Sequence, residues 1–314
     1  IATLPHIISF FISANAQMIV KILSQDKEIK GNLSALTEAI EQGADKQIAG
    51  VLGTLKNAIG IFNNPHIFWI LSKNEANLDV NSPNEPTMLL IGNDSKLPDT
   101  YAPIISLIIT IASKLMNEPN KLKSAIVIDE APTIYLPNFE HIPATARSNK
   151  VSVIVGAQDI SQMVDKYGQD KANVLISNLG NQFFGRTTNK ETAERVVQMF
   201  GQREDIEIMQ GSSGSGIAGA LGMHTNKSKS QTIVKRDRVK IQQVVNFRPG
   251  EFVGLIAEGN KKEIYTQLKQ GEDEEMNISY RQSISIEELN MNFDKIFDDI
   301  EQLIKENTND FGFR

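Results

Sequence analysis

The residues best suited to chemistry are two adjacent carboxylates in the middle of the sequence. The apolar run at 124–128 leads directly into Asp129 and Glu130, and Pro132 follows two positions later. A carboxylate at the first position would hold a Mg²⁺ ion that bridges the phosphates of ATP, usually through water, and the second would orient and polarise an attacking water. The pattern therefore predicts the Walker B segment of an ATPase, with Asp129 binding the metal and Glu130 acting in catalysis. The alternative is a buried strand that ends in ordinary surface acids.

The elements that must position these carboxylates indicate an α/β protein. A continuous apolar run of this length is typical of a central parallel strand that helices bury on both faces, and open α/β sheets bind ligands at the carboxyl ends of such strands. Predicted strands and helices alternate through short connections, which favours a parallel sheet covered on both faces. The strands are predicted at 87–92, 151–156, 181–185, 252–257 and 263–266, the last two completing one edge, and the helices at 99–117, 138–148, 159–179 and 190–200.

The two ends of the chain differ from this middle part. Residues 1–75 predict an all-helical subdomain, because 33–42 and 45–62 have helical spacing and polar residues interrupt the apolar stretch 4–23 too often for a membrane span. Residues 271–314 are an acidic tail with an amphipathic helix, which is either a partner-binding segment or a solvated terminal helix. We therefore predict three parts, with the α/β domain over 76–270 between the other two.

The composition is that of an ordinary soluble globular protein, with 314 residues of which 40% are hydrophobic and 22% charged. The absence of cysteine excludes a disulfide framework and a thiolate metal site, and it fits a reducing cytoplasm. The four histidines are too scattered to form a metal cluster. A formal net charge of -6 argues against nucleic-acid binding over the whole surface, although a local basic patch is compatible with it.

One such patch lies beside a glycine-rich segment at 211–222. Its cations would line a pore and contact the phosphate backbone of a single DNA strand. The alternative is a solvated hairpin that does not bind DNA. The glycine-rich segment predicts a flexible loop and not a phosphate cradle, because no Gly-Lys-Ser/Thr ending follows it. The cations are Lys227, Lys229, Lys235, Arg236, Arg238 and Lys240.

An ATPase of this kind also needs a phosphate-binding loop of the form Gly-x-x-x-x-Gly-Lys-Ser/Thr. No such pattern occurs in these 314 residues, and the sequence begins at Ile1 and not at Met. We therefore expect the chain to be a fragment whose phosphate-binding loop precedes Ile1, and we expect it to be inactive alone.

Several short motifs follow one another in order between residues 124 and 203. This series resembles the TraG/TraD-type coupling proteins of type IV secretion and conjugation, strongly over 124–203 and more weakly over about 50–270. The motifs are Ile126-Val127-Ile128-Asp129-Glu130-Ala131-Pro132, Arg147-Ser148-Asn149-Lys150, Ile154-Val155-Gly156-Ala157-Gln158-Asp159, Lys166-Tyr167-Gly168, Asn178-x-x-x-Gln182-Phe183-Phe184-Gly185 and Asn189-x-x-Thr192-Ala193.

The resemblance implies a RecA-like motor domain that assembles as a hexameric ring, uses ATP and Mg²⁺, and has an all-helical domain inserted before Walker B. In that family a membrane anchor precedes the phosphate-binding loop, so this chain would be a cytoplasmic C-terminal portion acting at the cytoplasmic face of the bacterial inner membrane. Its implied task is to deliver single-stranded DNA with its relaxase to a type IV secretion channel. Two rivals remain: an ATPase that powers channel assembly, and a non-catalytic module that docks relaxosome proteins.

The resemblance also assigns roles to three further residues. Gln158, at the end of the strand after Walker B, would sense the γ-phosphate of ATP, where a turn residue is the ordinary interpretation. Arg147 is implied as an arginine finger that reaches into a neighbouring subunit, and the alternative is a cation that stabilises a helix C-terminus. Arg186 is a weaker candidate for the same role.

Overall fold

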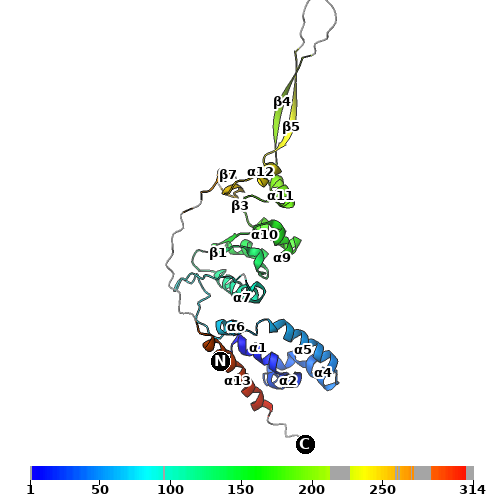
Figure 1. Ribbon diagram of the computed structural model, residues 1–314, viewed down its shortest axis with the longest axis vertical. Coiled ribbons are helices and arrows are strands. Elements are labelled where there is room, and N and C mark those ends of the chain that lie inside the picture. The colour runs from blue at the N-terminus through cyan, green and yellow to red at the C-terminus, as the bar shows by residue number, and fades with distance from the viewer. Residues whose placement is uncertain are drawn as a thin grey trace, which may run out of the picture. The chain divides into compact units, whose positions relative to one another are not determined.

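The computed structural model describes residues 2–94, 96–212, 227–258, 260, 262–269, 271 and 284–308, and for 209–212 and 227–230 it describes the backbone alone. The chain divides into two compact units, one made of residues 1–116 with 276–314 and the other of residues 117–275. Figure 1 labels the elements of both units. Each unit has its own hydrophobic core, so each is described separately.

The described part of the first unit is all-helical, as predicted for its N-terminal stretch. The apolar stretch 4–23 forms two helices, because Asn15 caps the second one by accepting a hydrogen bond from the Met18 amide at 2.9 Å. The helices predicted at 33–42 and 45–62 are confirmed as α4 and α5. The helices of this unit are α1 (Leu4–Ser13), α2 (Ala16–Leu23), α3 (Lys27–Asn32), α4 (Ser34–Glu41), α5 (Asp45–Gly60), α6 (Pro65–Leu71), α7 (Pro98–Met116) and α13 (Ile286–Thr308).

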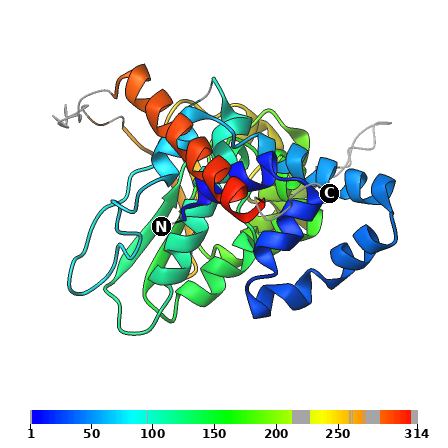
Figure 2. The ribbon, with the colours of Figure 1, turned by 90° about the horizontal axis from the view of Figure 1, so that it is seen from below.

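The amphipathic helix predicted for the acidic tail is α13, and it packs inside the first unit. It lies along α1 and α6, as the orange-to-red helix of Figure 2 shows. Ile296 is buried beside Phe68, and Ile300 is buried beside Phe10. The interpretation of a solvated terminal helix is therefore wrong for its apolar side, because the burial of apolar surface holds that side against the N-terminal helices.

The strand predicted at 87–92 is not formed. These residues have no regular secondary structure, and the side chains of Met88 and Leu90 are 82% and 68% exposed. A strand is stable only when a neighbour completes its hydrogen-bond ladder, and no strand in the described ranges pairs with this segment. The helix predicted at 99–117 is confirmed as α7, which is long and apolar enough by composition alone to cross a membrane, a test that core helices of soluble proteins also pass.

The second unit contains the segment with the two carboxylates. Strand β1 (Ser124–Ile128) pairs in parallel with β2 (Val151–Val155), and Val127 lies opposite Ile154. The side chains of these two residues are 66% and 56% exposed, so the predicted burial of the carboxylate strand on both faces is wrong for the described chain. The physical reason is that side chains alternate along a strand, and only the other face of this pair is covered.

Three further strands form an antiparallel sheet in the order β3-β6-β7, so among the described strands the predicted parallel arrangement holds for β1 and β2 alone. Strands β6 and β7 are joined by a short turn, which permits only antiparallel pairing. The strands are β3 (Gln182–Phe184), β6 (Glu251–Leu255) and β7 (Glu263–Gln267), and the helical segments are η1 (Ala131–Thr133), η2 (Phe139–His141), α8 (Ile142–Ala146), α9 (Ile160–Tyr167), α10 (Gln169–Asn178), α11 (Lys190–Phe200) and α12 (Ile241–Val245).

A long β-hairpin completes the second unit. Its strands β4 (Gln202–Ser212) and β5 (Lys227–Asp237) pair antiparallel along their full length, from Gln202 opposite Asp237 to Ser212 opposite Lys227 (Figure 1). The predicted flexible loop at 211–222 lies almost wholly outside the described residues. At the base of the hairpin, Val196 and Phe200 of α11 form a core with Val239 and Val244.

Candidate active site

The parallel pairing of β1 and β2 brings the predicted site residues Glu130 and Gln158 together. Both lie just beyond the carboxyl ends of these strands, and the Gln158 Nε2 donates a hydrogen bond to the Glu130 Oε1 at 3.3 Å. Both side chains are exposed, so a ligand has access to them. This is the edge at which α/β sheets bind ligands, and the carboxylate and the amide face each other across it.

Asp129 is positioned by a close approach to Gly156. A Cβ atom at position 156 would lie 2.8 Å from the Asp129 Oδ1, so a glycine is required there for the carboxylate to keep its place. The same Oδ1 accepts a hydrogen bond from the Glu130 amide at 3.0 Å. The Gly156 amide donates to the Ile128 carbonyl at 2.8 Å, which extends the ladder by one residue.

The backbone of Glu130 turns the chain sharply out of the strand. Its φ and ψ angles are 50° and 48°, the left-handed conformation that costs a residue with a side chain about 1–2 kcal/mol. Two hydrogen bonds hold it there: the Ala131 amide donates to the Gly156 carbonyl, and the Thr133 Oγ1 donates to the Glu130 carbonyl at 2.8 Å. A 3₁₀ turn then begins at Ala131 with Pro132 as its second residue, so the strand ends before Pro132.

A cavity of about 650 Å³ opens beside Glu130 and Gln158. This volume is in the range of small-molecule sites. No group of three or more potential metal-binding side chains occurs in the part of the chain that the structure describes. A single exposed carboxylate such as that of Asp129 would suffice for a Mg²⁺ ion whose other ligands are water and phosphate oxygens, the usual arrangement for this cation. The cavity is lined by Glu130, Pro132, Thr133, Gln158, Ser161, Gln162, Asp165 and Lys166.

Asp159 lies next to Gln158 and has structural contacts that the sequence did not predict. Its carboxylate caps α9 by accepting from the Ser161 amide at 2.8 Å, and it also accepts from the hydroxyls of Thr187 and Thr192. Burial raises the pKa of Asp159, but these hydrogen bonds outweigh it, and the pKa lies below its ordinary value. The signal in the sequence was an Asp at the start of the helix predicted at 159–179, because Asp is a favoured N-cap residue.

Tyr167 fixes the segment that follows Glu130. Its hydroxyl donates to the Ile134 carbonyl at 3.0 Å and accepts from the Leu136 amide at 3.3 Å. Burial raises the pKa of Tyr167 to about 12. Because Tyr167 belongs to α9, which begins next to Gln158, this contact ties the two sides of the cavity together.

Arg147 is not brought near Glu130 within the chain. It lies at the end of α8, before the amino end of β2, and its guanidinium pairs with Glu258 at 2.7 Å, both side chains being about 80% exposed. A strand of five residues at about 3.3 Å per residue puts roughly 16 Å between its two ends. Arg186, the weaker candidate, lines a cavity of about 420 Å³ that Gln158 also lines.

The predicted DNA-binding cations fall on the hairpin and just beyond it. Arg236 pairs with Asp205 and Glu207, and Arg238 pairs with Glu263, so these two charges are neutralised within the chain. Lys235 and Lys240 are exposed. The side chains of Lys227 and Lys229 lie outside the description, although their backbones belong to β5.

Comparison with known proteins now bears on this geometry. Residues 124–248 match the family model described as the TraM recognition site of TraD and TraG. No curated protein sequence matches the chain. Among solved structures, the unbound bacterial conjugative coupling protein TrwBdeltaN70 is similar with a TM-score of 0.57 and 16% identity, over 71% of this chain and 50% of that one.

Two nucleotide complexes of the plasmid coupling protein TrwB are similar to the same degree. The complex with the ATP analogue ADPNP has a TM-score of 0.55 at 16% identity, over 71% of this chain and 50% of that one. The complex with ADP and Mg²⁺ has a TM-score of 0.54 at 16% identity, over 73% of this chain and 49% of that one. The chain therefore spans about half the length of the solved structures that it matches.

The shared shape establishes the fold class: the chain has an α/β, RecA-like fold, as the sequence predicts. The family match narrows the likeness further. Over residues 124–248 the chain is similar to the TraG/TraD-type conjugative coupling proteins.

Proposed function

We propose that this chain is the motor portion of an ATPase that drives single-stranded DNA, with its relaxase, into a type IV secretion channel. The observation that carries the proposal is the contact of 3.3 Å between Glu130 and Gln158 at the carboxyl edge of β1 and β2, beside a cavity large enough for a ligand. In this arrangement the carboxylate can orient a water molecule for attack on the γ-phosphate. The amide can form a hydrogen bond with that phosphate.

The roles follow from the position of each group. Asp129 would hold Mg²⁺, and the ion would supply positive charge to the phosphates of ATP. Glu130 accepts the hydrogen bond that orients the attacking water, and Gln158 changes partner when the γ-phosphate leaves. The complexes of TrwB with ADPNP and with ADP and Mg²⁺ support nucleotide and magnesium as the ligands of this site.

The partners in the proposal are of two kinds. The first is a relaxosome protein, which the family description of residues 124–248 as a TraM recognition site supports. The second is the DNA strand, which exposed cations such as Lys235 and Lys240 would contact inside a hexameric ring. The ring would work at the cytoplasmic face of the bacterial inner membrane.

The same family description favours a second candidate function, a docking module without catalysis. Nucleotide titration and turnover assays on the full-length protein separate the two. We expect Glu130→Gln to keep ATP affinity and to abolish turnover, because the amide does not act as a base. We expect Asp129→Asn to weaken Mg²⁺-dependent binding itself.

Asp170→Asn is the matched control, because Asp170 is an exposed acid on α10 that does not line the cavity. It should leave both measurements unchanged. Wild-type turnover in the Glu130→Gln protein would disprove the catalytic assignment, and an absence of nucleotide binding by the wild-type protein would favour the docking module.

A further inference from the structure

A cluster of hydrogen-bonded side chains links the turn after β2 to helix α11. Asp159 follows Gln158 directly, and one of its carboxylate oxygens accepts from the Thr187 hydroxyl at 2.9 Å while the other accepts from the Thr192 hydroxyl at 2.8 Å. Both threonines are buried, at 8% and 5% exposure. Thr187 belongs to the turn after β3 and Thr192 to the first turn of α11, so a single carboxylate joins three segments.

Asn189 closes the cluster from the side of α11. Its Oδ1 caps α11 by accepting from the Thr192 amide at 3.1 Å, and its Nδ2 donates to the Ser161 Oγ at 3.3 Å. The Ser161 amide in turn donates to Asp159. The turns after β2 and β3 are therefore held together by bonds that run in both directions.

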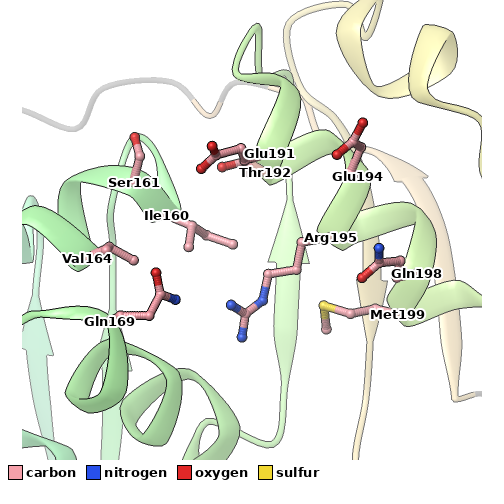
Figure 3. Close-up of a pocket in the computed structure, with 10 residues that line it drawn as sticks. All are labelled: Ile160, Ser161, Val164, Gln169, Glu191, Thr192, Glu194, Arg195, Gln198 and Met199. Atoms are coloured by element: carbon pink, nitrogen blue, oxygen red, sulfur yellow. The ribbon is translucent and has the colours of Figure 1, made fainter.

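Below this cluster a cavity of about 600 Å³ separates α9 from α11 (Figure 3). Figure 3 shows Ile160 and Val164 on one wall, Arg195 and Met199 on the other, and Ser161 and Thr192 at the end where the cluster lies. At one end of this space the polar cluster connects the two helices, through the hydrogen bond from Asn189 to Ser161.

Helix α11 continues from the cluster to the base of the hairpin. It ends at Phe200, and the next carbonyl, that of Gly201, accepts a hydrogen bond from the Arg238 amide at 3.1 Å just after β5. Val196 and Phe200 share one core with Val239 of the same junction. Close packing of this kind transmits displacement, so a shift of α11 would be passed to the base of the hairpin.

We propose that Asp159 is a positioning residue that couples the Glu130–Gln158 site to α11 and thereby to the β4–β5 hairpin. When Gln158 shifts on loss of the γ-phosphate, Asp159 shifts with it and displaces α11 through Thr187 and Thr192. The inference rests on the proposed function, because it takes the ligand of that site to be a nucleotide. It adds the mechanical link by which hydrolysis would move a DNA-contacting element.

The test uses the full-length protein and two spin labels. The chain has no cysteine, so Val174→Cys on α10 and Thr232→Cys on β5, both exposed, provide the only labelling sites that it contributes. The interspin distance is measured by double electron–electron resonance with Mg²⁺-ADPNP and with Mg²⁺-ADP. Nucleotide affinity and DNA-stimulated turnover are measured on the same proteins.

We expect the interspin distance to differ between the two nucleotides in the wild-type protein and not in Asp159→Asn. The asparagine keeps the shape of the side chain, but its NH₂ group only donates, so one of the two threonine hydroxyls loses its acceptor. Nucleotide affinity should stay within about twofold, while DNA stimulation of turnover should fall by about 5–150-fold, the usual range of coupling between sites. Thr187→Val reaches the same bond from its other end, which covers the case in which Asp159→Asn does not fold, and Asp170→Asn is the charge control.

The possible outcomes separate the coupling from the proposed function. A distance change that persists in Asp159→Asn and in Thr187→Val, or that is missing from a wild-type protein that binds nucleotide, overturns the coupling and leaves the proposed function standing. A merely structural cap would lower the melting temperature and would not remove the distance change. Failure of the wild-type protein to bind either nucleotide overturns the proposed function, and the coupling with it.

Discussion

At the residue scale, the candidate site depends on one strained backbone position and one close approach. Glu130 adopts a left-handed conformation, and Gly156 leaves room for the carboxylate of Asp129. Strain of this kind persists only when the surroundings hold it, and here the Thr133 hydroxyl and the Gly156 carbonyl do so. The geometry of the carboxylates is thus set by their neighbours as much as by their own side chains.

Gly156→Ala tests this dependence. The added Cβ would lie 2.8 Å from the Asp129 Oδ1, so the carboxylate must move, and we expect weaker Mg²⁺-nucleotide binding and a loss of about 1–3 kcal/mol in the free energy of unfolding. Nucleotide titration and urea unfolding measure the two effects. Gly53→Ala in α5 is the control, because nothing lies within 4 Å of its added Cβ, and it should stabilise the protein by up to about 1 kcal/mol. Unchanged nucleotide binding in Gly156→Ala would contradict the role given to Asp129.

Tyr167→Phe tests the anchor of the segment after Glu130. Removing the hydroxyl leaves the buried Leu136 amide without its acceptor, and we expect a loss of about 1–3 kcal/mol in the free energy of unfolding. The pKa of Tyr167 is raised from 10.0 to about 12 in the folded protein, so the unfolded state loses its proton first as the pH rises. The stability from this residue is therefore complete below pH 10 and is lost as the pH rises toward 12. Urea unfolding at several pH values should show a steeper decline above pH 10 for the wild-type protein than for Tyr167→Phe, and parallel declines would refute the assignment.

At the scale of elements, the β4–β5 hairpin presents two different faces. Residues opposite each other in the register share a face, so Ile206, Ile208 and Ile233 lie on one side and the ion pairs of Arg236 lie on the other. Those pairs tie β4 to β5. The cations of this region therefore divide into ones that stabilise the hairpin and ones that are available to a ligand.

This division gives a prediction for DNA binding. In the assembled full-length protein, Lys235→Gln should lower the slope of log affinity against log salt by about 0.7 for each contact with a single-strand phosphate that is lost. Arg236→Gln should change the slope less and should destabilise the hairpin, because its charge is already paired with Glu207. Salt titrations of DNA binding, with hydrogen exchange across β4 and β5, distinguish the two effects. Equal slopes for the wild-type and Lys235→Gln proteins would mean that Lys235 is merely solvated.

At the scale of the whole molecule, Arg147 and Glu130 lie at opposite ends of the paired strands. A finger at Arg147 would therefore serve the site of a neighbouring subunit and not its own. Such a finger stabilises charge on the transferring phosphoryl group and is worth roughly 10³–10⁵ in turnover. The pairing of Arg147 with Glu258 is exposed and weak enough to be exchanged for a phosphate.

Mixing subunits tests this arrangement. Arg147→Ala should keep nucleotide affinity and lose DNA-stimulated turnover, and mixtures with Glu130→Gln subunits should regain part of that activity, because some interfaces then carry both intact residues. Lys150→Ala, which removes a neighbouring cation of the same segment, is the control and should turn over normally. Normal DNA-stimulated turnover by a folded Arg147→Ala ring would rule the finger out and direct attention to Arg186.

Much of the second unit was predictable because its signals are local. A few neighbouring residues are enough to predict the secondary structure of three segments. These are the apolar run before Asp129 and Glu130, the run at 151–156 and the capped start of α11. The sequence indicates the hairpin only as an alternative for the basic segment. The isoleucines of β4 and β5 alternate along two separate stretches, and they share a face only once the two strands pair. The run at 87–92 failed for the converse reason: its composition favours a strand, but strands need neighbours that composition does not name.

The sequence alone determined the pair of carboxylates, the strands that precede them and Gln158, and the resemblance to the TraG/TraD family. Residue types and their order are sufficient for these three predictions. The tertiary structure decided which groups meet. Only parallel pairing of β1 with β2 puts the Gln158 amide 3.3 Å from Glu130, and only the approach of the turn after β3 gives Asp159 its two threonine donors. The burial of α13 against α1 is of the same kind, since their contacting residues Ile300 and Phe10 stand at opposite ends of the chain. Contacts between distant segments depend on how whole elements pack, and that information is not present in any single stretch of residues.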